Sequence, residues 1–217
     1  MLTNGKMYNV SKQQLIECST GYGNHGCIKG TAVNGFRYLT SGANSSDSKQ
    51  LQYWKSAWTE EEYPYTGKYS GEEACKATED RYDRHLPHVN VTKYWQVPRW
   101  DEAALRQAVA TIGPVAVTVD ASVREFQFYS SGIFALPSCR RYHVSHGMLL
   151  VGYDMAEESA TNPDKGSAKT TPSYWILKNS LGDGWGEEGF MKLVAGRNQC
   201  GISSLASFAV VRAVKNK

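Results

Sequence analysis

The second half of the sequence contains short apolar segments separated by glycine or polar turns, and this pattern limits the possible folds more than any other feature. Each segment is rich in valine, leucine or aromatic residues, as is typical of β-strands. The segments are PVAVTVDA, HGMLLVGYD, YWILKN, FMKLVA and SFAVVRAV, all between residues 114 and 214. The second half of the chain is therefore predicted to form an antiparallel sheet.

Helical signals precede these strands. Ser11 and Gln14 have the spacing of a capping box, and an apolar face begins at Leu15. Residues 31–39 place apolar side chains at helical spacing, and a further helix is predicted from Asp101, as its N-cap, to the Gly-Pro pair at 113–114. Helices followed by a sheet predict the α+β class.

Two stretches lack this order and are interpreted as loops. Residues from about 40 to 100 are polar and tyrosine-rich with little periodicity, and residues 155–173 are mostly Ser, Thr, Ala, Lys and Asp. The chain of 217 residues has room for one domain or for two lobes that share an interface. We expect one domain over residues 1–217, with a mostly helical and loop part over about 1–100 and a mostly β part over 101–217.

Composition excludes several classes of partner. The formal net charge is only +3, and the Lys and Arg residues are scattered rather than gathered in one run, so we expect no nucleic-acid binding. No apolar run approaches the roughly 20 residues that a membrane span needs. Three N-glycosylation patterns, beginning at Asn9, Asn44 and Asn90, favour an exported protein.

The glycine-rich stretch from Gly184 to Gly189 has the GxGxxG spacing of a dinucleotide-binding loop. In such a site the loop lies between a strand and a helix, so that the helix N-terminus faces the phosphates. Here another predicted strand follows Gly189, and Glu187 and Glu188 would repel a phosphate. We therefore interpret the stretch as a tight turn between strands, and we expect no nucleotide cofactor.

A histidine and an amide stand at the ends of two predicted strands. His146 begins HGMLLVGYD, and Asn179 ends YWILKN. If the strands are neighbours, the amide oxygen can accept the ring N–H, fix the tautomer and turn the other nitrogen toward a nucleophile.

Three pairs of histidine with histidine or cysteine have partial metal-ligand spacing, but no second pair matches them, so we predict no metal site. These pairs are His25 with Cys27, His85 with His88, and His143 with His146.

Taken together, six motifs resemble the papain-like cysteine peptidases of the cathepsin L type, in that family's order and over nearly the whole chain. The motifs are GPVAVTVDA, FYSSGIF, SHGMLLVGYD, YWILKNSLGDGWGEEGF, CGISSLAS and the early SKQQLIECS with GNHGCIKG. The resemblance implies a two-lobed fold with a helical lobe and an antiparallel β-barrel lobe. It also implies peptide-bond hydrolysis without a cofactor, in which His146 transfers the proton and Asn179 orients the His146 ring.

The family's nucleophile motif, which resembles CGSCW, is absent from these 217 residues. The start of the sequence resembles the segment after the family's central helix, so the resemblance implies that this helix and the nucleophile precede Met1. By the same resemblance Cys18 pairs with Cys75 and Cys139 pairs with Cys200. The fifth cysteine, Cys27, then remains unpaired because its partner would lie beside the missing nucleophile.

Several substrate contacts follow from the resemblance alone. Gly30 would let the backbone pair with an extended peptide, and Lys29 replaces a family glycine beside it. The pocket for the second substrate residue upstream of the cut would be lined by Thr118, Gly147 and Leu205.

The sequence also departs from the family beside the catalytic pair. Leu181 replaces a tryptophan that shields the His–Asn pair from water, whereas Trp185 is retained in the glycine turn.

These features leave two functions open. The first is the C-terminal part of an endopeptidase that is inactive alone because it has no thiol beside His146. The second is an inactive homologue that binds peptides or proteins. Expected partners are peptide or protein substrates and a protein inhibitor or propeptide, and we expect a monomer in a lysosomal or extracellular location.

Overall fold

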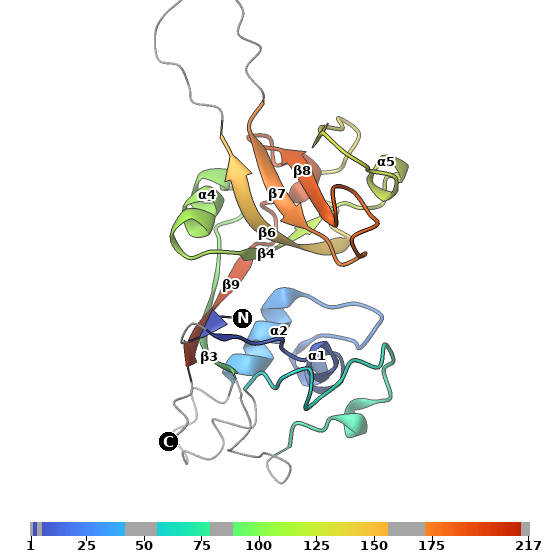
Figure 1. Ribbon diagram of the computed structural model, residues 1–217, viewed down its shortest axis with the longest axis vertical. Helices are drawn as coiled ribbons and strands as arrows, with labels where there is room; N and C mark the ends of the chain where they lie inside the picture. Colours follow the sequence, from blue (N-terminus) through green and yellow to red (C-terminus); the bar gives the residue numbers. More distant parts are fainter. Residues whose placement is uncertain (1, 4–5, 42–55, 79–88, 156–171, 214–217) are drawn as a thin grey trace, which may run out of the picture. The chain divides into compact units, whose positions relative to one another are not determined.

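The structure is a computed structural model of the 217-residue chain, and it describes all residues except 1, 4–5, 42–55, 79–88, 156–171 and 214–217 (Figure 1). The chain divides into two compact units. One consists of Met1–Trp95 with Ala209–Lys217, and the other of Gln96–Phe208. The glycosylation pattern at Asn44, most of the loop predicted at 155–173, and the pair His85 and His88 lie outside the described residues.

Seven strands of the described residues form one sheet, in the order β3-β9-β4-β6-β7-β8-β5. Strand β4 pairs antiparallel with β6 and β9, strand β7 pairs antiparallel with β6 and β8, and β5 runs parallel to β8. The strands are β3 (Val89–Gln96), β4 (Val115–Val119), β5 (Ile133–Phe134), β6 (His146–Asp154), β7 (Tyr174–Lys178), β8 (Phe190–Val194) and β9 (Ser207–Ala213). The five strands predicted in the second half are confirmed, and with them the α+β class.

Alternation along the strands builds the core of the second unit. Val115, Val117 and Val119 of β4 are buried while the residues between them are partly exposed, as a strand with one face on the core requires. Helix α4 (Glu102–Thr111) packs against β6 through an apolar stripe that includes Leu105 (Figure 1). Its N-cap is Asp101, as predicted, because the side chain accepts a hydrogen bond from the Ala104 amide at 2.8 Å.

The first unit is built around two short helices, α1 (Lys12–Cys18) and α2 (Ala32–Thr40). Ser11 caps α1 as predicted, but Gln14 does not complete the capping box. Its buried amide instead donates to the Tyr38 hydroxyl and the Ser56 carbonyl and accepts from the Trp58 amide. This side chain therefore connects α1 to α2 and to the segment at residues 56–58. The remaining short elements are β1 (Leu2–Thr3), β2 (Lys6–Met7), the helix α5 (Arg124–Gln127) and the 3-10 helices Thr20–Tyr22, Glu72–Ala74 and Gln199–Gly201.

The interpretation of residues 40–100 as mostly loop is wrong for residues 89–96. These residues form β3, in which Val89 and Val91 are fully buried. The alternation of valine with polar residues, followed by Tyr94 and Trp95, was a readable strand signal. The polar sequence on either side of residues 89–96 favours a loop and obscures this signal.

Candidate active site

The structure brings His146 and Asn179 into direct contact. His146 is the first residue of β6, and Asn179 follows the last residue of β7, the strand that pairs with β6. The ring nitrogen Nε2 of His146 lies 2.8 Å from Oδ1 of Asn179. The backbone N–H of Asn179 also donates to the Gly189 carbonyl at 2.9 Å, which fixes the backbone at this residue.

A neighbouring backbone group decides which tautomer this contact requires. The Ser180 N–H donates to the same Oδ1 at 2.8 Å. A backbone N–H can only donate, so the Asn179 atom that it meets must be the oxygen. This oxygen can only accept, and therefore Nε2 of His146 carries the hydrogen. The other ring nitrogen, Nδ1, keeps its lone pair in the neutral ring and can take up a proton from a reacting group.

The side chain of Asn179 is 8% exposed. Its Nδ2 is buried and has no hydrogen-bond partner among the residues that the structure describes. A buried donor without a partner costs on the order of 1–3 kcal/mol. The oxygen Oδ1 of the same side chain accepts two hydrogen bonds, from His146 and from the Ser180 N–H, while Nδ2 remains without a partner.

Aromatic rings support the histidine. The Phe126 ring meets the His146 ring edge-on with 5.9 Å between centroids, and the Trp185 ring lies 5.4 Å from that of Phe126. The Trp185 indole N–H donates to the Gln127 carbonyl at 3.2 Å. Phe126 was not singled out in the sequence. Its place between the motifs GPVAVTVDA and FYSSGIF is the signal that the sequence offers for it.

The glycine turn holds Trp185 in this stack. The Gly189 N–H donates to the Trp185 carbonyl at 2.8 Å. Gly186 and Gly189 both have positive φ angles, of 63° and 86°, which side chains disfavour. A Cβ atom on Gly186 would lie 2.5 Å from the Phe190 carbonyl oxygen, closer than atoms can approach. The turn leads directly into β8, so no helix N-terminus follows it.

Leu181, which stands where the family has a shielding tryptophan, is 58% exposed. Trp185 is 9% exposed and belongs to the buried core of its unit. Apolar cover near the pair therefore comes from the aromatic stack, while Leu181 has most of its surface in solvent.

Two of the three residues proposed for the substrate pocket are paired in the sheet, since Thr118 of β4 lies opposite Gly147 of β6. The third, Leu205, lies two residues before Ser207, the first residue of β9, which pairs with Ala116 of β4. The Thr118 hydroxyl is buried and has no hydrogen-bond partner among the described residues.

Lys29 and Gly30 belong to the other unit and are exposed. A Cβ on Gly30 would lie 2.9 Å from Oδ1 of Asn24, whose side chain accepts from the Thr31 amide at 2.9 Å. Glycine at position 30 is therefore also required by its own neighbours. Gly30 lines a groove of about 410 Å³ together with Leu15, Ile16 and Phe36.

Four of the five cysteines form two disulfides, Cys18 with Cys75 and Cys139 with Cys200. Cys27 is exposed, and it is the free cysteine among the residues that the structure describes. It lies in a turn closed by the His25 and Lys29 backbones, and α2 begins only at Ala32. Cys27 therefore does not stand at the start of a helix.

In the described ranges, no three His, Cys, Asp or Glu side chains gather closely enough to hold a metal ion. Among the same residues, no helix is both long enough and apolar enough to cross a membrane.

Comparison with known proteins identifies the family. Residues 1–210 match the papain family cysteine proteases. The chain is 36% identical to cathepsin L of Sarcophaga peregrina over 208 residues, which cover 95% of this chain and 52% of that protein. It is 37% identical to procathepsin L of Mus musculus over 211 residues, which cover 97% of this chain and 54% of that protein.

A solved structure agrees with these relatives. Digestive procathepsin L 3 from the larval midgut of Tenebrio molitor matches with a TM-score of 0.72 and 33% identity. The match covers 95% of this chain and 57% of that chain, and this chain spans about half the length of the curated relatives that it matches. On its fold and its sequence, the chain belongs to the papain family of cysteine proteases.

Proposed function

We propose that this chain is the C-terminal part of a cathepsin L-like endopeptidase, in which His146 transfers protons and Asn179 orients it. The observation that carries the proposal is the hydrogen bond from Nε2 of His146 to Oδ1 of Asn179, together with the Ser180 N–H that identifies the oxygen. This arrangement fixes the ring so that Nδ1 is the nitrogen that exchanges protons. It is the base-and-orienter half of a thiol site.

The reaction proposed for this pair has two stages, the formation of an acyl-thioester and its hydrolysis. Nδ1 takes the proton of a cysteine thiol, and the resulting thiolate attacks the carbonyl carbon of a peptide bond. The C–N bond then breaks as the imidazolium returns its proton to the leaving amine, which leaves an acyl-thioester. In the second stage Nδ1 removes a proton from water, and the hydroxide adds to the thioester carbonyl carbon. The C–S bond then breaks to release the acid product, and the imidazolium returns its proton to the sulfur.

We infer that the thiol in this reaction is not one of the five cysteines of the 217-residue chain. Four of them are in disulfides, and Cys27 lies in a turn rather than at the helix N-terminus that stabilises a catalytic thiolate. The chain alone should then hydrolyse no peptide. The imidazole without a sulfur cannot form the covalent intermediate.

The proposal includes the substrate contacts. In the first unit, the backbone at Gly30, beside Lys29, would pair with an extended peptide. In the second unit, Thr118, Gly147 and Leu205 would receive an apolar side chain. A protein inhibitor or a propeptide would compete with the peptide for these residues. Two disulfides favour an oxidising compartment, so we propose a lysosomal or secreted location.

The first test is an assay of the purified chain with a fluorogenic dipeptide substrate. No turnover is expected, either with or without thiol alkylation. Turnover that alkylation abolishes would contradict the proposal, and the variant Cys27→Ser would then show whether Cys27 is the nucleophile. The coding sequence around the 217 residues provides the second test, since an in-frame cysteine at the start of a predicted helix is expected there.

An inactive peptide-binding homologue is the second candidate, and the exposure of Leu181 favours it. A leucine that is 58% exposed leaves the His146–Asn179 pair with less apolar cover than a tryptophan would give. In this case the flanking coding sequence has a serine or glycine at the nucleophile position. The chain would then bind peptides without hydrolysing them, as calorimetric titration with the unlabelled dipeptide substrate would detect.

A further inference from the structure

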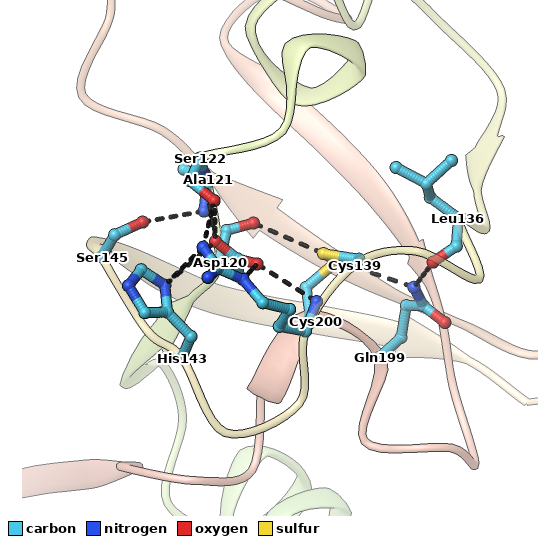
Figure 2. Close-up of a disulfide and its surroundings, with 10 residues drawn as sticks. Asp120, Ala121, Ser122, Leu136, Cys139, His143, Ser145, Gln199 and Cys200 are labelled. Atoms are coloured by element: carbon cyan, nitrogen blue, oxygen red, sulfur yellow. Dashed lines mark hydrogen bonds and ion pairs between the residues drawn. A yellow bond between two sulfur atoms is a disulfide. The ribbon is translucent and has the colours of Figure 1, made fainter.

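A buried carboxylate lies close to the histidine and has no part in the chemistry described above. Asp120 follows the last residue of β4, and its side chain is fully buried. It accepts hydrogen bonds from the Ser122 amide at 3.1 Å and the Ser122 hydroxyl at 2.5 Å. It also accepts from the Arg140 backbone N–H at 3.1 Å and from the Arg140 Nε at 3.2 Å. Figure 2 shows Asp120 with Ser122, His143 and the neighbouring disulfide.

His143 adds a further contact to this cluster. Its Nδ1 lies 3.3 Å from the Asp120 carboxylate and 3.2 Å from the Arg140 guanidinium. With a hydrogen on Nδ1 the ring donates to Asp120, and without one it accepts from Arg140. In both states the ring therefore has a partner in the cluster, while half of its own side-chain surface remains exposed.

The segment that Asp120 holds leads directly to the catalytic histidine. Residues 139–145 begin with the disulfide of Cys139 to Cys200 and end with Ser145, the residue before His146. The Asp120 carboxylate contacts this segment at Arg140 and His143. Figure 2 shows the His143 ring turned toward the Asp120 carboxylate, on which the contacts from Arg140 also converge.

The two neighbours of Asp120 in the sequence hold the end of the same segment. The Ser145 N–H donates to the Val119 carbonyl at 2.9 Å, and the Ser145 hydroxyl accepts from the Ala121 amide at 3.0 Å. Val119 is also the register partner of His146 in the sheet. The two residues that flank Asp120, Val119 and Ala121, therefore fix the backbone immediately before His146.

We propose that Asp120 is a positioning residue for His146, because its buried carboxylate holds the 139–145 segment in the geometry that brings Nε2 to Asn179. The Asp120 carboxylate has no hydrogen bond to the His146 ring and acts through Arg140 and His143, while its sequence neighbours Val119 and Ala121 hold Ser145. The inference rests on the proposed function, since that function gives His146 its role. A charged group is suited to this task because several donors from separate segments can converge on one carboxylate.

The test measures the tautomer of His146 in the full chain by the ¹⁵N shifts of its ring nitrogens, and the His146→Ala variant identifies the signals. The chain itself should show Nε2–H as the single tautomer. Two variants weaken the cluster, Asp120→Asn from the buried side and Arg140→Ala from the exposed side. Their matched controls are Asp101→Asn, at the cap of α4, and Arg141→Ala, the next residue in the segment, whose backbone carbonyl accepts from Ser204.

We expect Asp120→Asn and Arg140→Ala to lose the single tautomer and to show a mixture, while both controls keep the wild-type shifts. If Asp120→Asn does not fold, the pair Arg140→Ala and Arg141→Ala decides the question, since both positions are exposed. Wild-type ring shifts in a folded Arg140→Ala chain would overturn the proposal in that case, as they would in a folded Asp120→Asn chain. The readout requires no turnover, so it is independent of whether the peptidase assignment holds.

Discussion

Trp185 packs against Phe126 with 5.4 Å between ring centroids, and Phe126 in turn meets the edge of the His146 ring at 5.9 Å. The glycine turn therefore reaches the histidine through an aromatic stack and not by direct contact. Trp185 also lies 5.5 Å from the Tyr129 ring, so that it joins the site to the core. This stack gives the first prediction.

Replacement of Trp185 by alanine should lower the free energy of unfolding by about 3–5 kcal/mol, as for other buried large aromatic side chains. The cavity would lie beneath Phe126 and loosen its contact with His146. Urea denaturation monitored by circular dichroism measures the loss. Trp95→Ala serves as the control because Trp95 is 57% exposed, and it should change stability by no more than about 0.5 kcal/mol. Equal losses in the two variants would contradict the role of the stack.

Asn179→Ala should abolish the fixed tautomer of His146. Without Oδ1, the ring nitrogen Nε2 loses its acceptor at 2.8 Å, and the neutral ring can place its hydrogen on either nitrogen. Ring ¹⁵N shifts in the neutral state of the histidine measure the change. The exposed Asn9→Ala variant should retain the wild-type pattern. A single Nε2–H tautomer in Asn179→Ala would show that another group orients the ring.

Two glycines of the same turn should respond differently to alanine. Gly186 has a φ of 63°, and a Cβ there would lie 2.5 Å from the Phe190 carbonyl oxygen. Gly184 has no atom within 4 Å of the corresponding position. We expect Gly186→Ala to lower the unfolding free energy by about 1–3 kcal/mol because of backbone strain and the close contact. Gly184→Ala should be nearly neutral, and a thermal melt of both variants compares them directly.

The stability of the chain should fall in acid partly because of Asp120. Burial alone would raise the pKa of this carboxyl, but hydrogen bonds from Ser122 and Arg140 outweigh burial and hold the pKa well below its usual value. A lowered pKa in the folded state means that the stabilisation is fully present above the unfolded value of about 3.9 and is lost as the pH falls below it.

Urea midpoints measured from neutral pH down to acid pH should therefore fall less steeply in Asp120→Asn than in the wild-type chain. The variant is expected to be less stable at neutral pH, and the difference should narrow in acid. Asp101→Asn is the matched control and should follow the wild-type slope. A constant difference between Asp120→Asn and wild type at all pH values would show that the ionised carboxylate is not what stabilises the cluster.

The sequence alone determined the features that depend on neighbours along the chain. The alternation of Val115, Val117 and Val119 predicted a strand with one buried face, and Asp101 predicted the start of a helix. These signals are local because side-chain direction repeats every two residues in a strand and the cap bonds a residue three positions away. The same alternation is present at Val89 and Val91 in β3, within a stretch of polar sequence that favours a loop.

Only the tertiary structure decided how distant residues meet. His146 and Asn179 could be proposed as a pair from their places at two strand ends, but only the pairing of β6 with β7 places Nε2 of one against Oδ1 of the other. The contact of Phe126 with the ring and the convergence on Asp120 have no local signature, because they join segments that lie far apart in the sequence. Such contacts are set by strand pairing and core packing, and a pattern that repeats every two or four residues does not encode them.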